Sequence, residues 1–276
     1  MPVSTVSRQV AELERQLRVT LLERSTRKLR LTDVGAQVFE HARRSVDLSD
    51  AVGDLAGTYD SVVSGVIHLS SPPSISDSLL APLIDEFQRI HPQVRVQVIV
   101  TDRFVDLMAE GVDVAFIVGP LAGATLVSTP ILSYRHQVVA SPEYLAHRPP
   151  ITRPEDLLEH PLYAFSFWTP DNTWTFTHAG NGEHVAVRFK PHLSINDYHG
   201  IIPALLGGRG VGELPPVVRG DLLRERRLIE VIPQWHLPVF DFKVVHVANR
   251  YIPRAVRAFI ESVTVKAPLL FSGLPT

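Results

Sequence analysis

Cysteine is absent from the 276 residues of the chain. Its absence excludes disulfide bonds, thiolate metal sites and a cysteine nucleophile. No run of apolar residues reaches the roughly 18 that a membrane-spanning helix needs. The first residues also lack the apolar core of a signal peptide, so the sequence predicts a cytoplasmic protein.

The motifs of common catalytic sites are absent as well. The chain contains no H-E-x-x-H, G-x-S-x-G, P-loop or C-x-x-C motif, and its 12 histidines do not pair with acids at the spacing of metal ligands. The glycines at 208, 210 and 212 have the wrong spacing for a dinucleotide fingerprint and indicate a tight turn with close packing. We therefore expect no enzyme activity, no cofactor and no metal ion.

Charge is distributed unevenly along the chain. The net charge is −2, but residues 1–44 hold nine cations against five acids, a net charge of +4, so the other 232 residues are net −6. A basic end on an acidic body favours binding of a polyanion, with nucleic acid ahead of a membrane surface. A plain solvated surface is the alternative explanation of these cations.

The first 61 residues show the pattern of a small head followed by a long helix. Apolar residues recur at helical spacing: Val6, Val10, Leu13 and Leu17. Residues 25–32, "STRKLRLT", then alternate cations and leucines, which is typical of a strand. Thr32 is a candidate N-cap for a helix from 33 to about 61, which we expect to pack on a second copy of the chain.

From Gly65 onward, strands and helices alternate at the spacing of βαβ units, which predicts an α/β domain with a largely parallel sheet. Strands are expected at 65–71, 94–100 and 112–119, with helices at 74–92 and 102–111. Further strands are expected in "HQVVAS", "VAVRFKP", "LIEVI" and "FDFKVVHVA", and further helices at 155–158, 201–206 and 253–265.

The segment "STVSRQVAELERQLRVTLLERSTRKLRLTDVGAQVF" resembles the DNA-binding head of LysR-type transcriptional regulators, and the resemblance continues through "EFQRIHPQVRVQV", "DLMAEGVDVAF", "ASPEYL", "SINDY" and "GGRGVGELPPVV". It covers nearly the whole chain. It implies an α/β protein with a partial winged helix-turn-helix and a linker helix, followed by a two-subdomain effector domain like that of periplasmic binding proteins.

The resemblance also implies domain limits. The partial head would comprise residues 1–32, the linker or dimerisation helix 33–64 and the effector domain 65–276. The last would divide into subdomain I (66–136 and 238–276) and subdomain II (137–237). Arg18 stands where the family usually has Gly after the helix, and Leu22 where it usually has Phe.

A complete helix-turn-helix has two helices ahead of its recognition helix. Roughly 25 to 30 further residues are therefore expected before Met1, at about 11 residues per helix plus connections. Without them, the apolar stripe of the first helix would be exposed. Either the start codon is placed late, or the chain is truncated. In the second case the alternative function is an effector-binding protein that does not bind DNA and acts by dimerising with intact relatives.

For a complete head, the start of the recognition helix would meet base edges and the wing would hold phosphates. We assign Ser4, Thr5 and Arg8 to the major groove, and Arg8 is favoured for bidentate contact with guanine. Ser7 fits either a DNA contact or a bond to its own backbone. The predicted phosphate-binding residues are Arg24, Arg27, Lys28 and Arg30.

Open α/β sheets bind ligands at the carboxyl ends of their strands. The predicted effector-binding residues lie at these ends: Ser71, Ser74, Ser76, Thr101, Val118, Gly119, Asn196 and Gly210. Because Ser74 and Ser76 begin a helix, a small anion, with a carboxylate as the favoured class, is the expected effector. A capping box of Ser74 and Asp77 is the alternative, and Asp197 is favoured as the cap of a helix near Tyr198. The sequence thus predicts a cytoplasmic homodimer or homotetramer that binds operator DNA under control of this effector.

Overall fold

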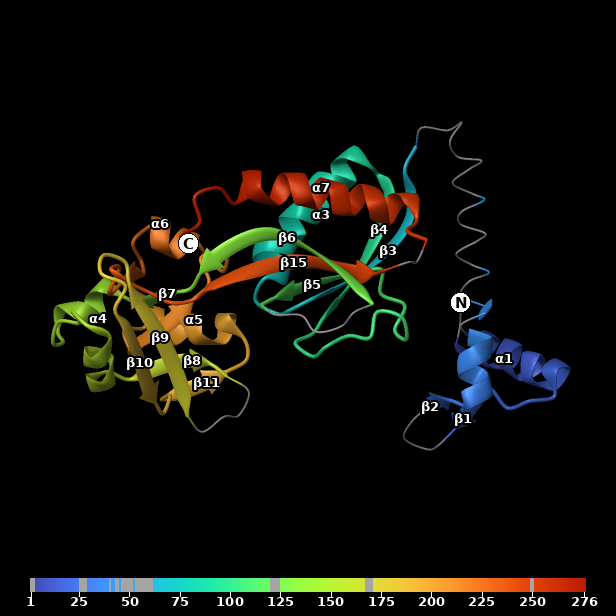
Figure 1. The fold of residues 1–276 in the computed structure, drawn as a ribbon, viewed down its shortest axis with the longest axis horizontal. Coiled ribbons are helices and arrows are strands. Elements are labelled where there is room, and N and C mark those ends of the chain that lie inside the picture. Colours follow the sequence, from blue (N-terminus) through green and yellow to red (C-terminus); the bar gives the residue numbers. More distant parts are fainter. Residues whose placement is uncertain are drawn as a thin grey trace. The chain divides into compact units, whose positions relative to one another are not determined.

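The structure is a computed structural model, and it describes residues 3–24, 29–39, 41–42, 45, 52, 62–119, 125–166, 171–248 and 251–276. The chain divides into two compact units (Figure 1). The first comprises Met1–Ser61 with Tyr251–Arg254, and the second comprises Val62–Arg250 with Ala255–Thr276. None of the helices in the described ranges is both long and apolar enough to cross a membrane.

The first unit opens with the predicted helix, α1 (Val3–Leu17), and continues into a two-stranded antiparallel hairpin. The hairpin strands are β1 (Leu22–Arg24) and β2 (Leu29–Leu31). Residues 33–39 are helical, as the candidate cap at Thr32 predicted, and β2 lies within the stretch where the alternation predicted a strand. The expected exposure of the apolar stripe on α1 is confirmed, since Val6 and Leu17 are 45% and 46% exposed.

The turn after α1 is held by its own helix and by the following helix. The Glu14 carboxylate accepts the backbone N–H groups of Leu21 at 2.7 Å and of Leu22 at 3.0 Å. Thr32 caps the next helix as predicted, because its Oγ1 accepts the Gly35 N–H at 2.9 Å. A Cβ at Gly35 would lie 2.0 Å from the Leu21 carbonyl oxygen, so only glycine fits there.

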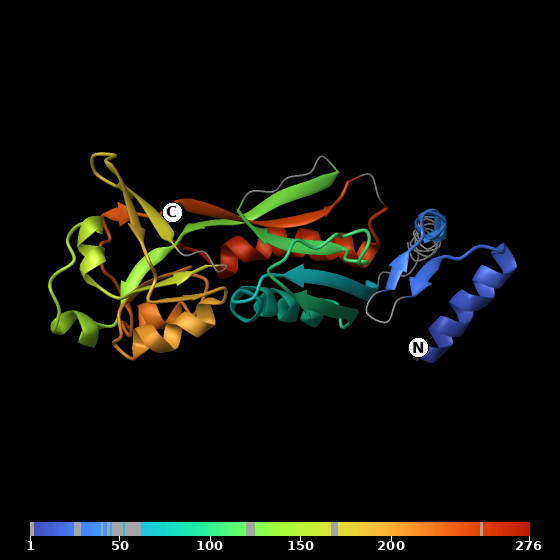
Figure 2. The ribbon, with the colours of Figure 1, turned by 90° about the horizontal axis from the view of Figure 1, so that it is seen from below.

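The second unit contains two lobes (Figure 2). The first lobe is built on a five-stranded sheet of order β4-β3-β5-β15-β6. Its strands are β3 (Ser64–Ser71), β4 (Gln93–Val100), β5 (Val114–Val118), β6 (Leu126–Arg135) and β15 (Val239–Val247). Only β3, β4 and β5 are parallel, and β15 runs antiparallel to both of its neighbours, so the expectation of a largely parallel sheet is corrected to a mixed one.

Two long helical segments cover this sheet. A π-helical turn η1 (Ser76–Leu80) leads into α3 (Ala81–Ile90), and α7 (Arg254–Leu270) closes the chain. Phe259 of α7 lies edge-on to Phe87 of α3, with ring centroids 5.1 Å apart, and edge-on to Phe116 of β5. Figures 1 and 2 show α3 and α7 on the same face of the sheet.

The second lobe carries a five-stranded sheet of order β11-β8-β12-β7-β13 and an antiparallel three-stranded sheet of order β10-β9-β14. Its strands are β7 (Gln137–Ala140), β8 (Leu162–Phe165), β9 (Asn172–His178), β10 (His184–Phe189), β11 (Leu193–Ile195), β12 (Val211–Leu214), β13 (Ile229–Glu230) and β14 (Trp235–His236). Its helices are α4 (Pro142–Ala146), η2 (Pro154–Glu159), α5 (Tyr198–Leu206) and α6 (Asp221–Arg224).

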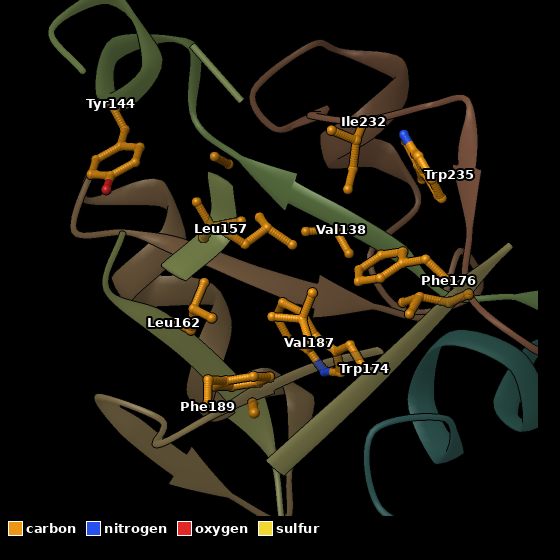
Figure 3. Packing of buried hydrophobic residues seen from close by; sticks show 14 residues of the cluster. Val138, Tyr144, Leu157, Leu162, Trp174, Phe176, Val187, Phe189, Ile232 and Trp235 are labelled. Atoms are coloured by element: carbon orange, nitrogen blue, oxygen red, sulfur yellow. The ribbon is translucent and has the colours of Figure 1, made fainter. Parts of the chain in front are cut away.

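The core of the second lobe forms between these two sheets (Figure 3). Trp174 and Phe189 pack edge to face with ring centroids 4.6 Å apart, and Trp235 belongs to the same buried cluster. Trp174 and Trp235 are therefore core residues of the second lobe. Trp168 lies outside the described residues.

The chain passes between the lobes twice. Strand β6 ends at Arg135 in the first sheet and β7 begins at Gln137 in the second, while β14 leads back into β15. Beside the first crossing, Arg135 forms a buried ion pair with Glu230, with Nη1 2.5 Å from Oε1, and Gln137 donates to the same carboxylate at 2.7 Å. The domain limits expected from the sequence stay predictions.

The helix expected at 102–111 is wrong, because this segment forms turns. The Asp106 carboxylate accepts the N–H groups of Met108 and Ala109, a local arrangement that competes with a helix. Strand β6 was not expected. Pro130 interrupts its pattern, which is tolerated because β6 is an edge strand of its sheet.

Candidate functional site

A cavity of about 520 Å³ lies between the two lobes of the second unit. The first lobe supplies most of its wall, from the end of β3, the segment after β4, and strands β5, β6 and β15. The second lobe contributes Phe165, Tyr198, Glu213 and Pro215. A volume of this size suits a small organic ligand.

Four of the predicted effector-binding residues line this cavity: Ser71, Ser74, Thr101 and Val118. The other four, Ser76, Gly119, Asn196 and Gly210, are not among its lining residues as far as the structure describes them. Gly119 has φ +85 and donates its N–H to the carbonyl of Asp241. A Cβ at Gly210 would lie 2.2 Å from the Pro161 carbonyl oxygen, so this glycine allows close packing of β12 on its neighbour.

Ser74 joins the two lobes directly. Its Oγ donates to Asp197 Oδ1 at 2.7 Å and accepts the N–H of Tyr198 at 2.8 Å. The backbone of Ser74 is left-handed, with φ +49, and the residue is 8% exposed. The capping box of Ser74 with Asp77 is therefore wrong, because the hydroxyl is committed to the opposite lobe.

Asp197 caps α5, as predicted, by accepting the His199 N–H at 3.0 Å. Burial raises the pKa of the Asp197 carboxyl, but the hydrogen bonds from Ser74 and His199 and the electrostatic interaction with His199 outweigh burial. The pKa therefore lies below its ordinary value of 3.8, and Asp197 is ionised at neutral pH.

Two more polar contacts join the lobes beside Ser74. The Asn196 amide donates to the carboxylate of Asp102, which lines the cavity. His199 Nε2 lies 3.2 Å from Asp77 Oδ2, within ion-pair distance, although the angle is not that of a hydrogen bond. Contacts from both lobes thus meet along one rim of the cavity.

A second polar group lies in the cavity wall at the first crossing. His136 Nδ1 is 3.2 Å from Glu213 Oε2 and 3.3 Å from the Tyr198 hydroxyl. Burial, with the negative charge of Glu213 and the neighbouring Tyr134, raises the pKa of Tyr198 well above 10.0. Burial likewise raises the pKa of Tyr134. Neither His136 nor Glu213 was predicted from the sequence as a binding residue. The spacing of the glycines before Glu213 marked this stretch only as a turn.

The structure describes only part of the predicted DNA-binding surface. On α1, Arg8 is exposed, whereas Thr5 and Ser7 are half-buried; Arg30 on β2 is exposed. Further along α1, Arg15 donates its Nε to Glu12 at 2.9 Å. Four predicted contacts fall outside the described part: the side chains of Ser4 and Arg24 and the whole of Arg27 and Lys28.

Two family models match this chain. Residues 60–267 match the LysR substrate binding domain, and residues 1–36 match the bacterial regulatory helix-turn-helix protein of the lysR family. The chain belongs to the family of LysR-type transcriptional regulators. The cavity of this LysR-type regulator lies within the part that matches the substrate binding domain.

Similar proteins agree with this assignment. The regulator is 29% identical over 274 residues to the probable HTH-type transcriptional regulator LtrA of Klebsiella pneumoniae, covering 98% of this chain and 88% of the relative. It is 30% identical over 260 residues to the HTH-type transcriptional regulator PtxR of Pseudomonas aeruginosa, covering 94% and 82%. These relatives are transcriptional regulators, a class that is not enzymatic.

Solved structures share the architecture. The full-length virulence activator AphB of Vibrio cholerae superposes with a TM-score of 0.66 at 26% identity, covering 95% of this regulator and 89% of AphB. CrgA of Neisseria meningitidis, a LysR-type transcriptional regulator, also gives a TM-score of 0.66, at 27% identity with 97% and 90% covered. The resemblance inferred from the sequence is thus confirmed, as is the mixed α/β fold.

Proposed function

We propose that this regulator binds double-stranded operator DNA through α1 and the hairpin of β1 and β2, under control of a small effector in the cavity between the lobes. One observation supports the proposal. The same chain carries a helix-turn-helix match with an exposed Arg8 and, within its substrate-binding match, a cavity of about 520 Å³.

The predicted DNA contacts stay the proposed ones. Arg8 projects from the first half of α1, and a guanidinium there can donate twice to one guanine. Arg30 on the hairpin is proposed to hold a phosphate, together with the other wing cations. We propose that Ser71, Ser74, Thr101 and Val118 face the effector, and that Ser76, Gly119, Asn196 and Gly210 support the surrounding wall.

Effector binding would act by changing the angle between the lobes, because a ligand shifts an equilibrium only through unequal affinities for its two states. We further propose that the regulator works as a homodimer or homotetramer in the cytoplasm, where its DNA lies. Sedimentation of the purified chain tests the assembly. The expectation of an anionic effector stays a prediction.

To test the proposed function, an operator is first selected in vitro from random DNA duplexes. Binding of the full chain to that operator is then measured by fluorescence anisotropy. Arg8→Ala should weaken binding to the selected operator by roughly 1–3 kcal/mol, or about 5- to 150-fold, and binding to random DNA much less. Arg15→Ala is the matched control on the same helix, because Arg15 pairs with Glu12. Equal losses for both variants would remove Arg8 from base readout.

Lys28→Ala should weaken binding to DNA of every sequence by a similar factor, and it should reduce the dependence of that affinity on salt concentration. Binding of DNA by the parent chain at low salt separates the proposal from its alternative. A parent that binds no duplex at low salt would favour an effector-binding protein that pairs with intact relatives.

A further inference from the structure

The cavity wall is dominated by aromatic and aliphatic side chains. Flat rings reach it from both lobes and from the loop after β4: Phe104, Phe116, Tyr134, Phe165, Tyr198 and Phe240. Phe116 and Phe242 stack with ring centroids 5.5 Å apart, which fixes one side of this wall. Surfaces of this kind bind a flat apolar body, because apolar area is removed from water and rings stack on rings.

The positive groups of the cavity are already paired. Among its described lining residues, only Arg103 and His136 can carry a positive charge. Both terminal nitrogens of Arg103 donate to Glu110, with Nη1 2.6 Å from Oε1, and this bond raises the pKa of Arg103 and lowers that of Glu110. His136 faces Glu213 at 3.2 Å. An anion would therefore find no unmatched cation in this wall.

Two of the hydroxyl groups expected to hold a carboxylate, those of Ser71 and Ser74, are engaged as well. The Ser74 hydroxyl donates a hydrogen bond to Asp197 and accepts one from the Tyr198 N–H. Ser71 donates to the carbonyl of Pro72 at 3.1 Å. A bound carboxylate needs hydrogen-bond donors, and the O–H groups of these two serines already donate to other acceptors.

Negative groups, by contrast, retain capacity to accept. Asp102 and Glu213 line the cavity, and an ionised carboxylate offers about four lone-pair sites. Among the described residues, the carboxylate of Glu213 pairs with His136, and the Glu213 side chain is 13% exposed. Carboxylates in an apolar wall repel an anion and attract a cation or an N–H or O–H donor.

We infer that the cavity binds an aromatic molecule bearing an amine or another hydrogen-bond donor, with that group directed at Glu213, and that it rejects aromatic carboxylates. The inference rests on the proposed function, because it takes this cavity as the effector site. It replaces the anion expected from the helix start at Ser74 with a ligand of opposite polarity.

The test uses matched triples of probes on phenyl, indole and naphthyl scaffolds, each as an ethylamine, an ethanol and an acetate. Binding to the full chain is measured by isothermal titration calorimetry at neutral pH. On at least one scaffold the amine should bind roughly tenfold or more tighter than the acid, with the alcohol between them. Glu213→Gln should reduce the preference for amine over acid at least several-fold while the alcohol changes little.

Glu110→Gln is the reciprocal variant, since it leaves the Arg103 charge unmatched. It should strengthen binding of the acids several-fold and weaken that of the amines. It also keeps the test decisive if Glu213→Gln does not fold. Acids that bind as well as amines, or no binding by any probe up to about 5 mM, would overturn the inference. Neither result depends on DNA, so failure of the proposed regulator function appears separately, in the anisotropy assay.

Discussion

The hydroxyl of Ser74 makes a sharp target because one oxygen serves both lobes. In Ser74→Ala the Tyr198 N–H, which lies in a buried residue, loses its acceptor, and Asp197 loses a donor at 2.7 Å. An unsatisfied buried N–H costs about 1–3 kcal/mol, and a hydrogen bond to a charged group contributes about 1.5–3 kcal/mol. Because the two losses share one group and are not additive, we expect the free energy of unfolding to fall by about 2–4 kcal/mol.

Urea unfolding followed by tryptophan fluorescence measures this loss, because Trp174 and Trp235 report on the core of the second lobe. Ser78→Ala is the matched control: its hydroxyl lies four residues away and donates only to the Ser74 carbonyl at 3.2 Å. It should cost less than about 1 kcal/mol. Ser74→Gly should be about 1 kcal/mol less damaging than Ser74→Ala, because glycine adopts φ +49 without strain. A Ser74→Ala variant as stable as Ser78→Ala would refute the bridging role.

Three further predictions concern other parts of the chain. Glu230→Ala leaves the buried Arg135 charge uncompensated and should lower the free energy of unfolding by about 3–5 kcal/mol. Glu183→Ala, which breaks the exposed pair with Arg153, should lower it by less than about 1 kcal/mol. Equal losses for the two variants in urea unfolding would contradict this difference between buried and exposed pairs. Gly35→Ala forces a Cβ to within 2.0 Å of the Leu21 carbonyl oxygen and should destabilise the first unit by about 3 kcal/mol. The measurement is amide hydrogen exchange, which should become faster at Leu21 and Thr32. Gly111→Ala is the control, because a Cβ there would meet nothing within 4 Å, and it should leave that exchange unchanged. Burial, aided by the charge of Arg148, lowers the pKa of His160 below 6.5, so just below that pH the unfolded chain binds this proton and the folded chain does not. The free energy of unfolding should therefore fall on acidification from pH 6.5, by at most about 1.4 kcal/mol per pH unit. His160→Gln should remove this slope, whereas His147→Gln, at an exposed position, should keep it.

Features that depend on neighbours in sequence could be predicted from the sequence. Four such features are each set within a few residues, and the structure contains them all: the apolar stripe of α1, the caps at Thr32 and Asp197, and the strand β15. Each is a local choice between a small number of backbone states, so composition and spacing are enough to indicate it.

Features that join distant residues could not be predicted in the same way. Ser74 meets Tyr198 across 124 positions, and His136 meets Glu213 across 77. The helix-start pattern at Ser74 is compatible with a cap, an anion site or a contact with the other lobe, and only the fold selects among them. The family resemblance implied a site between two subdomains, but its charge depends on the pairing of Arg103 with Glu110, which lie in a segment whose turns the sequence did not indicate.

The two strands that connect the lobes are also each other's partners. Strands β6 and β15 pair continuously from Leu126 with Val247 to Arg135 with Val239, apart from one irregularity between Phe242 and Lys243. A hydrogen-bonded ribbon resists sliding of one strand along the other but twists at low cost. When one lobe rotates on the other, both connecting strands must therefore twist together, as a single two-stranded ribbon. The irregularity at Phe242 sets where that torsion is most easily absorbed, and Phe240, two residues nearer the crossing, would carry the turn into the wall of the cavity.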